Sequence, residues 1–275
     1  MRFVTNMQKI VSFIPNLFTL GNLFCGCLAI IYAFNWQLDW AAYMVFLAAF
    51  LDFFDGFFAR LLKVDGELGK QLDSLADMVS FGVVPGIVIY QVLSVTEIAV
   101  HDTFFVLHDF FYIKYLALII PIFSCYRLAK FNIDTRQSNG FLGLPTPANA
   151  IFFCSIPLIF ILNGFYFSGT HNGYTLTKTE LAIMAEVIFA SPLILLLNVY
   201  VLSALCVIFS LLLVSNIPLF ALKFKNFGWA DNKVRYIFLA LCAVLLILFQ
   251  FIAIPFIVIL YILTSIVNNI FKLTV

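Results

Sequence analysis

The sequence has 275 residues, of which 64% are hydrophobic and 11% are charged, and its mean hydropathy is +1.08. Soluble globular domains carry about 25% charged residues, so this composition excludes a soluble enzyme and indicates an integral membrane protein. The formal net charge is only +1, which offers no basic surface for nucleic acid.

Apolar runs that approach the length of a membrane span recur along the whole chain. A transmembrane helix needs about 20 apolar residues. The predicted spans are 15–34, 41–62, 71–94, 113–131, 147–165, 199–221, 236–252 and 254–271. We therefore expect an all-α polytopic membrane protein of about eight spans, in which Pro255 marks a turn or kink in the last apolar run.

The positions of the basic residues give the chain an orientation. If Arg2 and Lys9 lie in the cytoplasm, eight spans leave most of the other Lys and Arg residues in cytoplasmic loops, as the positive-inside rule requires. The apolar run 181–197 would be a ninth span, but it would move the basic loop 222–235 to the outside. We therefore expect 181–197 to be an interfacial or packed helix. We expect the protein itself to lie in the inner (plasma) membrane.

Acidic residues interrupt the second and third predicted spans, at Asp52, Asp55, Asp73 and Asp77. Asp52 and Asp55 are three residues apart and share a helix face, while Asp73 and Asp77 are four apart on the next helix. A carboxylate in the membrane core costs at least about 2.5 kcal/mol, so these groups need partners. Arg60 would neutralise one of them. The remaining negative charge suits a hard cation such as Mg²⁺, Mn²⁺ or Ca²⁺.

Other interpretations of the acids remain open at this point. Acids at helix ends are common on wet surfaces, and Asp65 and Glu67 in the intervening turn fit that description. A cation transporter or channel would also use intramembrane carboxylates, although it would spread them along a pore. The small residues Gly56 and Ala59 favour an enzyme, because they would let a metal-bound pyrophosphate approach closely.

The pattern Asp52-x2-Asp55-Gly56-x2-Ala59-Arg60-x8-Gly69-x3-Asp73-x3-Asp77 resembles the signature of the CDP-alcohol phosphatidyltransferase family at every fixed position. The resemblance implies a six-helix catalytic core over 10–221. The predicted cytoplasmic loop and C-terminal transmembrane hairpin over 222–275 are an addition to that core. It implies that an alcohol attacks the β-phosphorus of CDP-diacylglycerol, and that CMP leaves. It also implies a two-metal site for Mg²⁺ or Mn²⁺ held by the four aspartates, with Asp77 as the general base, and a homodimer.

The same resemblance implies where the nucleotide binds. The residues for CDP and its phosphates would be Gly56, Ala59, Arg60 and Gly69. Upstream, the stretch "IPNLFTLGN" (14–22) is similar to the family's first helix, and Asn16 and Thr19 would face the cytidine. Asn16 would equally serve as an ordinary helix cap.

Two further stretches, 72–86 and 127–150, resemble the membrane-embedded bacterial phosphatidylserine synthases within that family. The acceptor would then be L-serine, whose carboxylate needs the cationic fork that arginine supplies. The candidates for binding serine or the lipid phosphate are Arg127, Lys130, Asn132 and Arg136. The three cations would equally serve only to fix the topology. Glycerol 3-phosphate, inositol phosphate and choline remain alternative acceptors, although the two phosphates would want a denser basic cluster and choline an aromatic cage.

Overall fold

The computed structural model describes residues 2–64, 66–103, 112–133, 141–162, 198–219 and 228–271. Its α-helices are α1 (Arg2–Phe34), α2 (Leu38–Leu62), α3 (Glu67–Asp77), α4 (Val84–Thr103), α5 (Ile119–Ile133), α6 (Thr146–Leu162), α8 (Val199–Val214), α9 (Trp229–Phe249) and α10 (Ala253–Phe271). A π-helix over Met78–Val83 joins α3 to α4, and 3₁₀ turns over Ile113–Leu118 and Gln250–Ile252 precede α5 and α10. The strands β1 (Phe141–Leu142) and β2 (Pro218–Leu219) have two residues each. The predicted all-α membrane architecture is confirmed.

Within the described residues, four helical stretches are long and apolar enough to cross a membrane. They are Phe13–Phe34, Glu67–Ser94, Ile113–Ile133 and Asn232–Phe271, and the last contains the turn between α9 and α10. Thr146–Ile159 and Val199–Val214 are shorter apolar helices. Each of the eight predicted spans overlaps a helix, and α4 continues to Thr103, past its predicted end at residue 94. The number of spans stays a prediction, and the run 181–197 lies outside the described residues.

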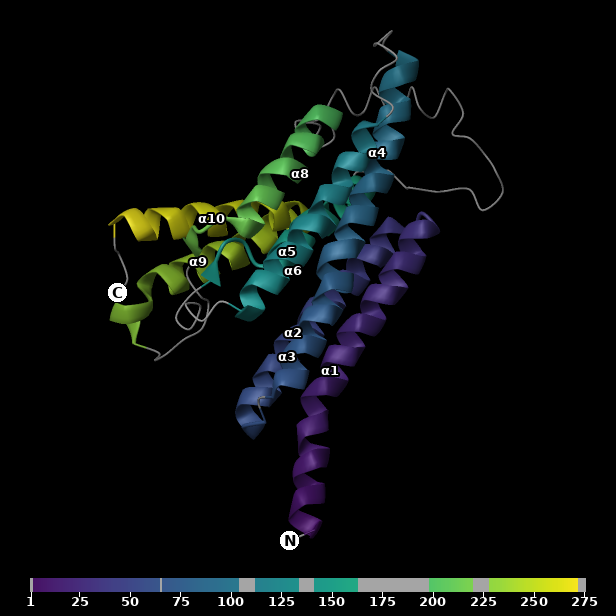
Figure 1. The fold of residues 1–275 in the computed structure, drawn as a ribbon. Coiled ribbons are helices and arrows are strands. Elements are labelled where there is room, and N and C mark those ends of the chain that lie inside the picture. Colours follow the sequence, from purple (N-terminus) through teal and green to yellow (C-terminus); the bar gives the residue numbers. More distant parts are fainter. Residues whose placement is uncertain are drawn as a thin grey trace.

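One half of the molecule contains α1, α2 and the continuous helical stretch made of α3, the π-helix and α4, and these three lie side by side (Figure 1). Helix α1 packs most extensively against α2. Small side chains are fully buried on these two helices, at Ala29, Ala33, Ala41, Ala42 and Ala48. Small residues let helix backbones approach closely in a membrane, where packing rather than the hydrophobic effect holds helices together.

Helix α1 also lies very close to the π-helix that follows α3. A Cβ atom added to Gly26 would stand 2.4 Å from Ser80 Oγ, so only glycine fits at this crossing. The Ser80 hydroxyl in turn donates a hydrogen bond to the Asn22 carbonyl oxygen at 3.0 Å. This contact fixes the position of α1 along its axis relative to Asp77, the last residue of α3 before the π-helix.

The strand pair β1–β2 ties the start of α6 to the end of α8. Leu144 N donates to Leu212 O at 2.9 Å, and Gly143 has a φ of 78°, a conformation that favours glycine. The predicted span 199–221 is too long as a single helix, because α8 ends at Val214 and Pro218 lies in β2. Proline has no backbone N–H and cannot continue the helical hydrogen bonding.

The C-terminal hairpin of α9 and α10 lies across the half of the molecule that contains α5, α6 and α8 (Figure 1). Its turn begins at Gln250, which has a φ of 49°, rather than at Pro255. Pro255 lies in the first turn of α10, where a missing N–H costs nothing because that group has no helical partner. Helix α10 packs against α6 and β2.

Candidate active site

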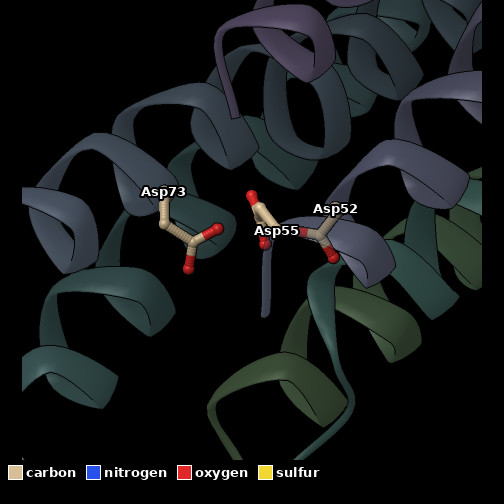
Figure 2. A group of neighbouring side chains, drawn as sticks. All are labelled: Asp52, Asp55 and Asp73. Atoms are coloured by element: carbon tan, nitrogen blue, oxygen red, sulfur yellow. The ribbon is translucent and has the colours of Figure 1, made fainter. Parts of the chain in front are cut away.

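The four aspartates come together where α2 and α3 converge. Carboxylate oxygens of Asp52, Asp55 and Asp73 all lie within 4.8 Å of one another. Figure 2 shows Asp73 reaching across from one helix toward Asp52 and Asp55 on another. Asp77 follows one turn after Asp73, is buried, and lies within hydrogen-bonding range of Asp52. Four negative charges this close repel one another, so the group requires a cation or shared protons.

Helix α1 supplies a hydroxyl and an amide that orient two of these carboxylates. Thr19 Oγ1 donates to Asp55 Oδ2 at 2.8 Å, and Asn22 Nδ2 donates to Asp77 Oδ1 at 3.1 Å. The sequence predicted that Thr19 would face the cytidine. In the structure, the Thr19 hydroxyl donates its hydrogen bond to Asp55. The role of Asn22 was missed, although it lies three residues from Thr19 and therefore on the same face of an apolar helix.

A cleft of about 510 Å³ opens beside the aspartates, and we call the aspartates and this space together the acid cleft. It brings together five of the predicted nucleotide-binding residues, namely Asn16, Thr19, Gly56, Ala59 and Gly69. A Cβ atom on Gly56 would meet nothing nearer than Arg60 Nη1 at 3.8 Å, so the absent side chain leaves open space. Arg60 itself is exposed in the last turn of α2.

Arg127 on α5 is a buried basic side chain, with only 7% of its surface exposed. Its Nη1 donates to Thr146 Oγ1 of α6 at 3.2 Å, while its Nε is buried without a hydrogen-bond partner. The guanidinium is near enough to Asp77 to interact with it electrostatically. Arg127 therefore connects the acid cleft to the other half of the molecule.

Further buried polar atoms without partners lie one helical turn from these residues. The Asn149 side chain is fully buried and neither atom of its amide has a hydrogen-bond partner. It follows Thr146 by three residues, and Ser124, whose Oγ is also without a partner, precedes Arg127 by three. A buried polar group left unpaired costs about 1–3 kcal/mol, so such a group calls for a ligand or water. We use the name Arg127 pocket for this group of polar side chains on α5 and α6, namely Ser124, Arg127, Thr146 and Asn149. Of the four, only Arg127 lines the small cavity beside it.

The other predicted acceptor residues lie in different places. Lys130 lines a small cavity with Arg127 and donates from Nζ to Asn216 Oδ1 at 3.2 Å. Asn132 lies against α3, where its Nδ2 donates to Ser74 Oγ at 2.9 Å, and it is not among the residues that line that cavity. Arg136 lies outside the described residues. The sequence did not predict Ser124, Thr146 and Asn149 as site residues. The one feature that could have indicated them is a polar side chain within or beside an apolar run.

Comparison with known proteins agrees with this geometry. Residues 12–190 match the family model described as CDP-alcohol phosphatidyltransferase. The chain belongs to this family.

Among its relatives in the CDP-alcohol phosphatidyltransferase family, the chain is similar to the CDP-diacylglycerol–serine O-phosphatidyltransferase of Bacillus subtilis, with 36% identity over 154 residues, 56% of this chain and 78% of the relative. The Helicobacter pylori (strain J99) protein of the same name is 37% identical over 140 residues, 50% of this chain and 54% of the relative. The archaetidylserine synthase of Methanothermobacter thermautotrophicus is 36% identical over 167 residues, 58% of this chain and 64% of the relative. For the last two relatives the match therefore covers less than two thirds of their length.

Members of the CDP-alcohol phosphatidyltransferase family use a divalent metal ion, and the acid cleft fits one. Three carboxylates from two helices offer oxygen atoms within 4.8 Å of one another. One of these groups also holds a buried atom without a hydrogen-bond partner, Asp73 Oδ1. A donor set made only of oxygen suits Mg²⁺ or Mn²⁺ rather than a softer metal.

Proposed function

We propose that this protein transfers the phosphatidyl group of CDP-diacylglycerol to the hydroxyl of L-serine, giving phosphatidylserine and CMP for phospholipid biosynthesis. The observation that carries the proposal is the position of Arg127, a buried cation within electrostatic range of Asp77. A buried cation within electrostatic range of the proposed base is what a small acceptor with a carboxylate needs. The names of the related serine transferases support the same acceptor.

The acid cleft would hold the nucleotide half of CDP-diacylglycerol. Its open space at Gly56 would admit the pyrophosphate, and Asn16 and Gly69 lie across the cleft from α2, where the cytidine would fit. Arg60, exposed at the end of α2, would contact the phosphates from the water side. Asp52, Asp55, Asp73 and Asp77 would hold two ions of Mg²⁺ or Mn²⁺. Bound there, the metal would neutralise the pyrophosphate and the departing CMP.

The reaction is a substitution at phosphorus. The serine hydroxyl oxygen forms a bond to the β-phosphorus, the bond from that phosphorus to the CMP oxygen breaks, and CMP leaves with the electron pair. Asp77 takes the hydroxyl proton. Asn22 holds the Asp77 carboxylate through Oδ1, so the other carboxylate oxygen remains for the metal and the proton.

The Arg127 pocket would bind serine next to this base. The unpartnered Nε of Arg127 would donate to the serine carboxylate, and the unpartnered amide of Asn149 would offer both a donor and an acceptor to a zwitterion. Lys130, held by Asn216, would add a positive charge nearby. Arg136 keeps its predicted place as a further candidate for serine or the lipid phosphate.

Acceptor competition tests the function. Purified protein in detergent is given CDP-diacylglycerol and Mg²⁺ or Mn²⁺ with L-serine, glycerol 3-phosphate, inositol phosphate or choline, and the lipid product is identified by mass. We expect phosphatidylserine, and no CMP release in excess chelator. Phosphatidylglycerophosphate as the main product would reject serine as the acceptor and keep the family's reaction. Cation movement across vesicles without any lipid product would reject the enzyme and favour a transporter.

We also propose the membrane location of the reaction, the bounds of the catalytic core and the oligomeric state. The acid cleft would face the cytoplasm from the inner (plasma) membrane, because the positive-inside rule places the loop between α2 and α3 on that side. The catalytic core would span 10–221, and 222–275 would be an added loop and hairpin. A homodimer is proposed as well, and the mass of the detergent-solubilised protein, measured by light scattering, would check it.

A further inference from the structure

The C-terminal hairpin lies beyond residues 12–190, the part of the chain that matches the family model, yet it contacts the proposed catalytic core. Helix α10 packs against α6, which carries Thr146 and Asn149 of the Arg127 pocket. It is also bonded to β2, because Asn269 Nδ2 donates to the Pro218 carbonyl oxygen. Since β2 pairs with β1 just before α6, the position of α10 is set by the same strand pair that positions the pocket.

Tyr261 is the residue of α10 that reaches the pocket. Its side chain is only 9% exposed, and its hydroxyl lies near enough to the Arg127 guanidinium for electrostatic interaction. The ring also packs against Phe238 of α9, with the ring centroids 5.9 Å apart. The backbone carbonyl of Tyr261 accepts a hydrogen bond from Ser265 Oγ at 2.7 Å.

We propose that Tyr261 is a positioning residue of the acceptor site, through which α10, packed against α6, contributes to the Arg127 pocket. This inference rests on the proposed serine transfer. An arginine with one hydrogen bond, to Thr146, and a free Nε can still rotate about its side-chain bonds. A phenol oxygen within electrostatic range of the guanidinium favours one orientation of the fork through its dipole, and the Asp77 carboxylate attracts the same fork. The serine carboxylate would then meet Arg127 in a fixed orientation.

The test separates the hydroxyl from the ring. Tyr261→Phe keeps the ring contact with Phe238 and removes only the oxygen. We expect the KM for L-serine to rise about 10-fold, because one hydrogen bond or dipole that orients a charged group is lost. The KM for CDP-diacylglycerol and the kcat should stay within about 2-fold of the wild-type values. The thermal midpoint of unfolding should stay within about 2 °C. The matched control is Tyr126→Phe, which removes an exposed hydroxyl from α5 one residue before Arg127.

A second measurement does not depend on turnover. L-serine added to the full-length protein with Mg²⁺ and a non-hydrolysable CDP-lipid should raise the thermal midpoint of the wild type and of Tyr126→Phe, and raise that of Tyr261→Phe much less. If Tyr261→Phe cannot be recovered, Tyr261→Leu takes its place and is compared with Phe238→Leu, which disturbs the same ring contact but keeps the hydroxyl. An equal rise of the serine KM in these two variants would overturn the inference. An unchanged KM for serine with an active wild type would overturn this inference alone. A wild type that transfers no phosphatidyl group to serine would overturn the proposed function and this inference with it.

Discussion

The acid cleft takes its functional groups from α1, α2 and α3, which follow one another in the chain, whereas the Arg127 pocket takes its groups from α5 and α6, to which we propose that α10 adds Tyr261 from far along the chain. In the acid cleft, hydrogen bonds from α1 hold Asp55 and Asp77. In the Arg127 pocket, several buried polar atoms have no partner. The first region therefore holds two of its carboxylates in place before any ligand binds, although Asp73 Oδ1 still lacks a partner, whereas in the second region the proposed serine would supply the missing partners.

This difference matches what each region would bind. The nucleotide and its phosphates are common to every acceptor that the family's reaction admits, and rigid carboxylates at fixed spacing suit them. The acceptor alcohol is small and polar, and its recognition depends on whether buried donors and acceptors find partners. Substitutions in the acid cleft should therefore affect the chemistry, and substitutions in the Arg127 pocket should affect the acceptor alone.

The largest effect is expected for Asp77→Asn, which keeps the shape of the side chain and removes the proposed base. Serine-dependent CMP release should fall about 10²–10⁴-fold, while CDP-diacylglycerol still binds. Asp73→Asn should also weaken the binding of Mn²⁺, measured by calorimetry on the purified protein. Equal and mild effects of the two variants would contradict separate roles for these residues.

The next effect is expected for Arg127→Lys. Lysine keeps the charge and loses the planar fork, so kcat/KM for serine should fall about 10–100-fold. The KM for CDP-diacylglycerol should change little, and that split would distinguish the two regions. Lys233→Ala serves as a control, since this lysine is exposed on α9. Equal rises in both KM values would show that the regions are not separate.

A smaller effect on the other substrate is expected for Gly56→Ala. The added methyl group has room in the free protein, where the nearest atom would be 3.8 Å away, but it would occupy space that the pyrophosphate needs. The KM for CDP-diacylglycerol should rise about 10-fold, and the KM for serine and the thermal midpoint should stay constant. Phe57→Leu, on the exposed face of α2, is the control. A lowered thermal midpoint would mean that the cleft is closed in the free protein.

The smallest effect is expected for Ser74→Ala at the boundary between the two regions. Ser74 exchanges hydrogen bonds with Asn132 and so joins α3 to α5. Its loss should lower the free energy of unfolding by about 1 kcal/mol, seen as a slightly lower thermal midpoint. Ser94→Ala is the matched control, because the Ser94 hydroxyl bonds only to the Tyr90 carbonyl within the same helix. Equal thermal midpoints for the two variants would show that the contact between α3 and α5 contributes nothing.

The sequence predicted the acid cleft well because its information is local. Asp52 and Asp55 share a face of one helix, Asp73 and Asp77 share a face of the next, and a short turn brings the two helices together. What it missed there came from α1. The spacing of Thr19 and Asn22 puts them on one face, but spacing alone does not say which helix that face meets.

The Arg127 pocket was predicted less completely, because spacing along one helix does not say which other helix its polar face meets. Arg127 and Lys130 stood out as cations near a predicted membrane boundary, but burial distinguishes them: Arg127 is enclosed between helices and Lys130 is bonded to Asn216. The contribution of α10 depends on the β1–β2 pairing, which joins segments far apart in the chain. No periodicity in the sequence encodes a pairing of two residues per strand.

The hydrogen bonds from α1 have a consequence for the order in which this protein is made. A ribosome releases α1 before α2 and α3, so Thr19 and Asn22 are already in the bilayer when Asp55 and Asp77 arrive. Each acid can then find its donor as it enters the membrane, which offsets part of the cost of placing a carboxylate there. Helix α1 would in this way supply hydrogen-bond donors to the carboxylates as they are inserted. If α1 were moved to the C-terminal end of the chain, these carboxylates would enter the lipid without those donors.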